Sequence, residues 1–286
     1  MNVIPKQKIE YRSMTLANGR KVNYVHQGEG EPVLMVHGLA ASLHDWDDLL
    51  PELEQAGYSG YALDLLGHGE SEKPLHTHEY SVENAYADFA AWVDGLALQQ
   101  PFTLIGHSLG AGLSMLYALR NPQAVRGLVL VNPFYSIHQL PVILQRVFRH
   151  QLINTSLIER TPYRLFRFFV DMTSFNYYLG HRESHVLPEH IRYQTALDYK
   201  RASSGIYNIP RTLPASADMD LARLTQPTLL LWGGRDQTLA TASFPQLAEK
   251  LPNLVNKHHF PICGHVPHQC HPADFNPHVM EFLSKV

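Results

Sequence analysis

The feature that most constrains this chain is a series of short apolar runs that alternate with stretches of helical periodicity. Each run is apolar at consecutive positions, so both of its faces would be buried in a strand. Strands of this kind, separated by helices, form parallel sheets with helices on both sides. We therefore predict an α/β fold with a mostly parallel, twisted sheet. The runs lie at 32–38, 59–69, 102–108, 127–133, 227–236 and 254–260, and the helical stretches at 45–57, 81–98, 110–121, 242–252 and 273–286.

Two segments depart from this alternation. Residues 10–27 hold two alternating runs joined by Asn18-Gly19, which predict an antiparallel hairpin with positive φ at both turn residues. Residues 134–215 hold helical segments and no strand pattern, so we expect a helical cap inserted after the sixth strand. The predicted organisation is a core made of residues 1–133 and 216–286, with the cap between its two parts.

Composition excludes several classes of protein. The 286 residues carry a net charge of −3, which gives no general case for binding nucleic acid. No apolar run is long enough to cross a bilayer, and the first residues lack the apolar core of a signal peptide. Two cysteines are too few for a disulfide scaffold. We expect a cytoplasmic protein that acts on a small molecule, and the sequence leaves its oligomeric state open.

The charge of the predicted cap differs from that of the core. The cap holds ten Lys and Arg against five Asp and Glu, a net charge of +5. One interpretation is that these residues form solvated helix faces. The alternative is a lid that attracts anionic substrates or makes a weak contact with an acidic membrane surface.

Ser108 lies in Gly-His-Ser-Leu-Gly, residues 106–110, between a predicted strand and a predicted helix. A serine on so tight a turn takes a strained backbone conformation, and glycines at Gly106 and Gly110 leave room for it. The turn lifts the hydroxyl clear of the sheet, at a helix N-terminus that favours developing negative charge. We therefore predict that Gly106, His107 and Gly110 form an elbow around a nucleophilic Ser108.

An alcohol needs a base to take its proton. His265 follows the last predicted strand, where a loop can return it to the carboxyl edge of the sheet. His268 and His271 are close competitors. With the cysteine at 270, these three histidines also allow a zinc cluster, but their spacing fits no standard zinc pattern, so we expect no metal.

The base needs an acid to orient it. Asp236 ends an apolar run, at the same predicted edge and between the nucleophile and the base in the chain. Asp218 and Asp220 are the alternatives, and an aspartate at 236 also suits a helix cap. The end of the preceding run holds Asn132, which carries no charge.

The oxyanion formed in acyl transfer needs two hydrogen-bond donors. The first expected donor is the main-chain N–H of Leu109, directly after the nucleophile. The second is the N–H of Leu39, in the loop after the run that ends in His37-Gly38.

These motifs are similar, in order and spacing, to those of the α/β-hydrolase fold superfamily, and the resemblance covers nearly the whole chain. It implies a triad of Ser108, His265 and Asp236, a structural role for Asp64, and a variable cap at the position of the insertion. The matching segments are the His-Gly loop at 37–38, DLLGHGES at 64–71, GHSLG at 106–110, WGGRD at 232–236 and Gly-His at 264–265.

The serine narrows the chemistry that the resemblance implies. Members with an aspartate nucleophile, such as haloalkane dehalogenases and epoxide hydrolases, are excluded. We expect hydrolysis of a carboxylic ester or related acyl bond without a cofactor. The alternatives are carbon–carbon bond hydrolysis of a vinylogous diketone acid, with Arg146, Arg164 or Arg167 binding its carboxylate, and a receptor-like binder of a small molecule. The residues expected to line the pocket are His37, Gly38, Leu140, Phe148, Phe166, Phe169 and Tyr178.

Overall fold

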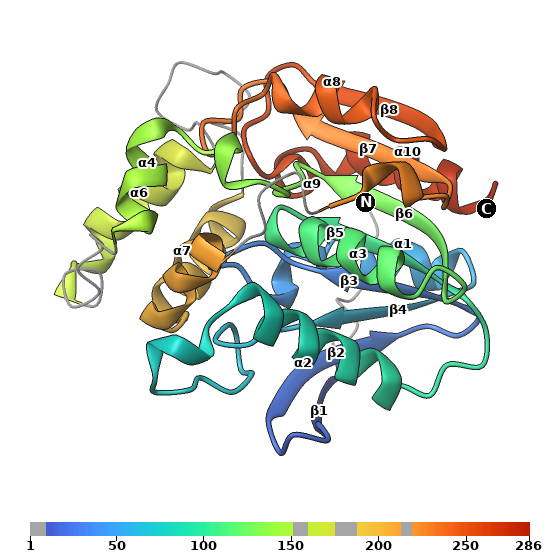
Figure 1. Ribbon diagram of the computed structural model, residues 1–286, viewed down its shortest axis with the longest axis horizontal. Helices are drawn as coiled ribbons and strands as arrows, with labels where there is room; N and C mark the ends of the chain where they lie inside the picture. The colour runs from blue at the N-terminus through green and yellow to red at the C-terminus, as the bar shows by residue number, and fades with distance from the viewer. Residues whose placement is uncertain (1–9, 151–159, 175–187, 213–218) are drawn as a thin grey trace.

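An eight-stranded sheet runs through the computed structural model, which describes residues 10–150, 160–174, 188–212 and 219–286 (Figure 1). The strand order is β1-β2-β4-β3-β5-β6-β7-β8. β1 and β2 pair antiparallel, β2 pairs antiparallel with β4, and all the remaining pairs are parallel, which confirms the predicted fold class. The strands are β1 Tyr11–Thr15, β2 Lys21–Gln27, β3 Glu31–Val36, β4 Tyr58–Leu63, β5 Phe102–His107, β6 Val125–Val131, β7 Thr228–Gly233 and β8 Leu254–Phe260.

Helices cover both faces of the sheet. The α-helices are α1 Leu50–Gln55, α2 Val82–Gly95, α3 Leu109–Arg120, α4 Val142–Arg149, α6 Tyr163–Thr173, α7 Glu189–Arg201, α8 Ser243–Ala248, α9 Pro267–Cys270 and α10 Pro272–Leu283. Short 3-10 helices are η1 Leu43–Trp46, η2 Thr77–Glu79, η3 Ile137–Gln139, η5 Ser204–Thr212 and η7 Leu221–Arg223.

Successive residues of the central strands enter two different cores. In β6, Leu128 and Leu130 pack into the core that α2, α3 and α8 share, whereas Val129 and Val131 pack against α1 and α10. This two-residue alternation places apolar side chains on both faces of the sheet. The continuous apolar runs of the sequence follow from it.

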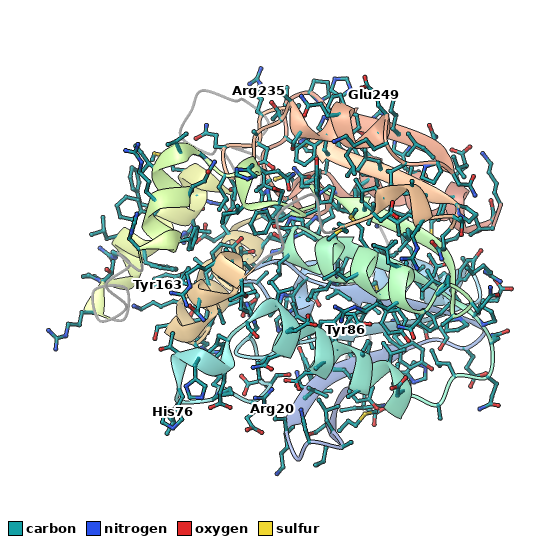
Figure 2. The ribbon with its side chains drawn as sticks, in the orientation of Figure 1. Arg20, His76, Tyr86, Tyr163, Arg235 and Glu249 are labelled. Carbon is teal, nitrogen blue, oxygen red and sulfur yellow. The ribbon has the colours of Figure 1, made fainter. Side chains whose placement is uncertain are left out.

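The amino-terminal hairpin forms as predicted, but its turn differs from the prediction. Gly19 has φ of 85°, whereas Asn18 is not among the residues with positive φ. The Gly19 N–H donates to the Leu16 carbonyl, and the Leu16 N–H donates to the Arg20 carbonyl. A longer turn with only its last residue left-handed therefore replaces the two-residue turn. Arg20, which is labelled in Figure 2, binds the carboxylates of Glu79 and Asp88 and so ties the hairpin to α2.

The single helix predicted over 45–57 is divided. A short 3-10 helix, η1, ends at Trp46, and α1 begins only at Leu50. Pro51 stands in the first turn of α1, where its missing N–H and fixed φ are tolerated. The division leaves residues 37–49, which include η1, between β3 and α1 at the carboxyl end of β3.

The segment between β6 and β7 contains helices and no strand in its described parts. Its helices α4, α6 and α7 lie on the side of the molecule toward which the arrows of β4 and β7 point, so they cover the carboxyl edge of the sheet (Figure 1). None of the helices in the described residues is long and apolar enough to span a membrane.

Asp64 holds the turn after β4. One of its carboxylate oxygens accepts a hydrogen bond from the N–H of Leu43 at 2.8 Å, and the other accepts from Asn23 Nδ2 at 2.8 Å and from the N–H of Glu70 at 2.9 Å. The side chain is buried. It thus joins the loop after β3, the hairpin and its own turn, as the resemblance implied.

We expect Asp64→Ala to lower the free energy of unfolding by at least about 3 kcal/mol, because it leaves several buried donors without acceptors. Urea denaturation followed by circular dichroism measures the loss. Asp94→Ala, at an exposed helix position, is the matched control and should change stability by no more than about 0.5 kcal/mol. Equal effects of the two substitutions would contradict the role of Asp64.

Candidate active site

The turn from β5 into α3 places Ser108 in a strained conformation, with φ of 50° and ψ of −115°. A side chain at Gly106 would lie 2.5 Å from the Cα of Ala111, and one at Gly110 would overlap the main-chain oxygen of Val36. Both glycines are therefore required for the turn to form, as the sequence predicted. Ser108 is 5% exposed and stands at the N-terminus of α3.

Three predicted side chains meet at this turn. His265 Nδ1 lies 2.7 Å from Asp236 Oδ2, and His265 Nε2 lies 3.0 Å from Ser108 Oγ. Since the carboxylate can only accept, Nδ1 carries the hydrogen and Nε2 is left to accept the serine proton. The imidazole is thus oriented to act as a base toward Ser108.

Asp236 is held as a charged group. Its Oδ1 accepts hydrogen bonds from the main-chain N–H groups of Thr238 and Leu239, and its Oδ2 also accepts one from Asn132 Nδ2 at 2.7 Å. Burial raises the pKa of Asp236, but the His265 imidazole and these donors outweigh it, so the pKa is lowered. Asn132 stands at a strand end where an acid was considered, and its amide instead helps to position Asp236.

The loop after β3 lies against the nucleophile. A side chain at Gly38 would lie 3.1 Å from the Cβ of Ser108. Neither the Leu39 N–H nor the Leu109 N–H has an acceptor in the described part of the chain. The next N–H, that of Ala40, donates instead to His68 Nε2 at 2.9 Å, and Ala40 has φ of 67°.

Several residues predicted to line a pocket have other partners. His37 is fully buried, with Nδ1 bonded to the Gly38 carbonyl and Nε2 accepting from the N–H of Leu65, so we assign it to the fold of the loop. Leu140 is buried in the core beside α3, Phe148 packs against the same core, Phe166 packs against α7 and Phe169 is 50% exposed. Tyr178 lies outside the described residues.

The three arginines proposed for a substrate carboxylate differ in their surroundings. Arg167 is paired with Glu189 and Asp171. Arg146 and Arg164 are exposed. Of the three, Arg167 therefore has acidic partners within the inserted segment.

His268 and His271, the two alternatives to His265 as the base, have other surroundings. His268 is buried and faces Asp45, and its ring stacks on Trp46 with centroids 5.0 Å apart. His271 stands at the start of α10. Among the described residues, the one group placed to hold a metal ion is Asp45, His107 and His268, so the histidines of residues 265–271 do not form the zinc cluster considered above.

A model of the alpha/beta hydrolase fold matches residues 31–272. The chain belongs to the alpha/beta hydrolase fold family. The match contains the serine turn, the aspartate, the histidine and the inserted helices, so the resemblance drawn from the motifs is confirmed.

Curated relatives of this alpha/beta hydrolase catalyse different reactions. This chain is 26% identical to cis-3-alkyl-4-alkyloxetan-2-one decarboxylase of Shewanella oneidensis, over 94% of this chain and 86% of that protein. It is 28% identical to 2-hydroxymuconate semialdehyde hydrolase of Pseudomonas sp. strain CF600, over 98% of this chain and 96% of that protein. The expectation that the chain is an enzyme, a hydrolase, is confirmed.

Solved structures share the fold of this alpha/beta hydrolase. A thermophilic esterase from Thermogutta terrifontis superposes with a TM-score of 0.79 at 20% identity, covering 96% of this chain and 98% of that one. An epoxide hydrolase from an endophytic Streptomyces superposes with a TM-score of 0.78 at 24% identity, covering 97% of this chain and 96% of that one. At these identities the likeness establishes the fold alone.

The backbone at Ser108 gives a prediction about stability. Glycine adopts positive φ without strain, whereas alanine keeps the strain of serine. We expect Ser108→Gly to be about 1 kcal/mol more stable to urea than Ser108→Ala, although both lack the hydroxyl. If the glycine variant is less stable than the alanine variant, the inferred backbone strain at residue 108 is wrong.

Asp198 of α7 joins the inserted helices to the loop after β3. Its Oδ2 accepts a hydrogen bond from Ser42 Oγ at 2.7 Å, and its Oδ1 accepts one from Gln194. Burial raises the pKa of Asp198 to about 6, although Ser42 lowers it. Between about pH 4 and pH 6, the Asp198 carboxyl therefore keeps its proton in the native state, whereas the same carboxyl in the unfolded chain has lost it.

This raised pKa gives a pH dependence. The stability from Asp198 is complete below the pKa of the unfolded chain, near 4, and is lost as the pH rises through about 6. Between pH 4 and 7 the loss is about 2 kcal/mol. Urea denaturation across this pH range gives the free energy of unfolding at each pH. Asp198→Asn should remove this part of its pH dependence, and Asp94→Asn should leave the dependence unchanged.

Proposed function

We propose that this protein is a serine hydrolase that cleaves a carboxylic ester or a related acyl bond. The observation that carries the proposal is the continuous line from Ser108 Oγ through the His265 ring to Asp236 Oδ2, with contacts of 3.0 and 2.7 Å. A hydroxyl, an imidazole and a buried carboxylate in this order activate an alcohol for attack on a carbonyl carbon.

In the proposed reaction, Ser108 Oγ attacks the carbonyl carbon while its proton passes to His265 Nε2. Asp236 stabilises the imidazolium that forms, and the proton then passes to the leaving alcohol. Water attacks the resulting acyl-enzyme by the same route and releases the acid. No cofactor is needed for either half of the reaction.

We assign the oxyanion to the N–H groups of Leu39 and Leu109. Leu109 follows Ser108 at the start of α3, and Leu39 follows Gly38, where an added side chain would lie 3.1 Å from Ser108 Cβ. Neither N–H has an acceptor within the described residues. The positive end of the α3 dipole adds to their effect. Donors of this kind, fixed before the reaction, are worth about 3–4 kcal/mol each in the transition state.

We also propose that residues 134–215 form a cap over this site. α7 reaches the loops of the core at three places: Asp198 binds Ser42, Thr195 Oγ1 lies 3.4 Å from Gln269 Oε1, and Ala196 packs with Val266, next to His265. The side of the site opposite the sheet is therefore formed by the cap, where we expect the acyl group to bind.

The test is hydrolysis of p-nitrophenyl butyrate together with labelling by a fluorophosphonate probe. We expect Ser108→Ala and His265→Ala each to lower kcat by at least about 10³-fold, and Asp236→Asn by a similar factor, because the three groups act as one unit. Labelling should disappear in Ser108→Ala. His271→Gln is the matched control and should retain wild-type activity.

A label that persists in Ser108→Ala would mean that the nucleophile is another residue. Full activity of His265→Ala, with loss in His271→Gln, would overturn the assignment of the base.

Carbon–carbon bond hydrolysis is the second candidate, because the relative that matches over 98% of this chain is named as a hydrolase of 2-hydroxymuconate semialdehyde. In that case Arg146 or Arg164, which are exposed, would be free to bind a substrate carboxylate. Labelling of Ser108 without turnover of a panel of simple esters, and with turnover of a vinylogous diketone acid, would favour this reaction over ester cleavage.

A further inference from the structure

A buried polar cluster lies behind the His265 ring and takes no part in the proposed reaction. Its members are Asp45 of η1, His107 at the end of β5 and His268 of α9, and none is more than 6% exposed. One ligand atom from each lies within 4.8 Å of the others. His107 precedes the nucleophile and His268 follows the proposed base by three residues, so the cluster touches both halves of the site.

His107 binds the main chain of the proposed base. Its Nε2 lies 2.9 Å from the carbonyl oxygen of His265, and the two rings are 4.9 Å apart at their centroids. A carbonyl oxygen only accepts, so His107 Nε2 carries a hydrogen. The other ring nitrogen, Nδ1, then faces Asp45 Oδ2 at 3.4 Å.

The two facing atoms attract each other when a proton lies between them. Without one, the lone pair of His107 Nδ1 would point at a carboxylate oxygen in a site that excludes water, which is unfavourable. Apart from this 3.4 Å contact, which is too loose to count as a hydrogen bond, His107 Nδ1 and Asp45 Oδ2 have no hydrogen-bond partner in the described part of the chain. Burial raises the pKa of Asp45, but the imidazoles of His107 and His268 outweigh it and lower that pKa. Burial and the neighbouring His268 lower the pKa of His107 to about 4, although Asp45 raises it.

The orientation of Asp45 is also fixed. Gln269 Nε2 donates to its Oδ1 at 2.8 Å, and His268 Nε2 lies 3.6 Å from its Oδ2. Both residues belong to α9, which begins two residues after His265. Asp45 is thus held by the same segment whose main chain His107 binds, and the contacts form a closed ring around the peptide of the proposed base.

We propose that Asp45 and His107 are positioning residues for the catalytic histidine, a role that rests on the proposed function. Asp45 contacts the His107 ring at Nδ1, and His107 Nε2–H holds the carbonyl of His265. The His265 ring is thereby kept at the distance from which it reaches both Ser108 and Asp236. A displacement of about 1 Å at such a site costs on the order of 10²-fold in rate.

Two substitutions of His107 test the contact with His265. The amide nitrogen of Gln reaches about as far as Nε2 and can donate to the carbonyl, whereas Leu cannot. We expect His107→Leu to lower kcat for p-nitrophenyl butyrate by about 10²-fold with KM within about twofold, and His107→Gln to recover about tenfold of that loss. His78→Gln, at an exposed position, is the matched control.

Equal kcat values for the Gln and Leu variants, at equal thermal stability, would overturn the proposal, because a purely structural role does not distinguish a donor from an apolar side chain. A change confined to KM would overturn it as well.

A double-mutant cycle tests whether Asp45 acts through His107. Asp45→Leu should lower kcat by about tenfold in the wild-type background and have no further effect in His107→Leu, because the group that it positions is already absent. The same factor in both backgrounds would mean that Asp45 acts independently, and the proposal would be wrong.

The metal content of the wild-type protein provides a test that needs no folded variant. Two histidines and a carboxylate are also zinc ligands. Inductively coupled plasma mass spectrometry should find far less than one equivalent of zinc after purification without chelators. About one equivalent of zinc in the wild-type protein would indicate that Asp45, His107 and His268 hold a metal ion, and the proposal would be wrong.

Fluorophosphonate labelling separates this proposal from the proposed function. If the wild-type protein is not labelled at Ser108, the proposed function itself fails. If the wild type is labelled and the His107 and Asp45 variants are labelled at the same rate, only the positioning role fails.

Discussion

The turn between β5 and α3 is the constraint on which the rest of the candidate site depends, since it decides how closely α3 approaches the sheet. Gly110 lies so near the carbonyl of Val36 in β3 that no side chain fits there. This approach brings the first N–H groups of α3 and the loop after β3 to the same point. Ser108, raised on a strained backbone, stands between them. A bulkier turn would move α3 outward and separate the nucleophile from the N–H groups assigned to the oxyanion.

Around this turn, each polar side chain is held by another that comes from a different strand end. Asp236 is oriented by Asn132, and His265 by Asp236 through its ring and by His107 through its main chain. Positive φ values at Asn132 and Ser108 show that the backbone bends sharply at both strand ends. Strain of this kind persists only where surrounding contacts fix the conformation, and here the surrounding hydrogen bonds are buried. The proposed chemistry thus depends on a network that extends well beyond three residues.

The inserted segment meets the core through the buried side chains of Ile206 and Ile209 in η5 and through polar contacts of α7. Arg192 and Arg167 both pair with Asp171, and Arg167 also pairs with Glu189. These cations hold α6 against α7 and are not available to a substrate. The tie between the insertion and the loop after β3 is instead Asp198, whose proton is lost near pH 6. The stability of the fold would then respond to pH through a residue outside the proposed triad.

The sequence by itself determined the sheet, the serine turn and the order of the three proposed catalytic residues. Apolar periodicity and glycine spacing are local properties, and parallel strands bring their carboxyl ends to one edge, so Asp236 and His265 could be placed near Ser108 before any coordinates. The hairpin turn and the start of α1 were predicted wrongly because several local conformations suit the same residues. Only the tertiary structure decided which side chains meet: Asn132 with Asp236, His107 with the His265 carbonyl, and His268 with Asp45. Loop side chains have no periodicity, and these partners come from separate segments of the chain, so their directions depend on how the loops pack against one another.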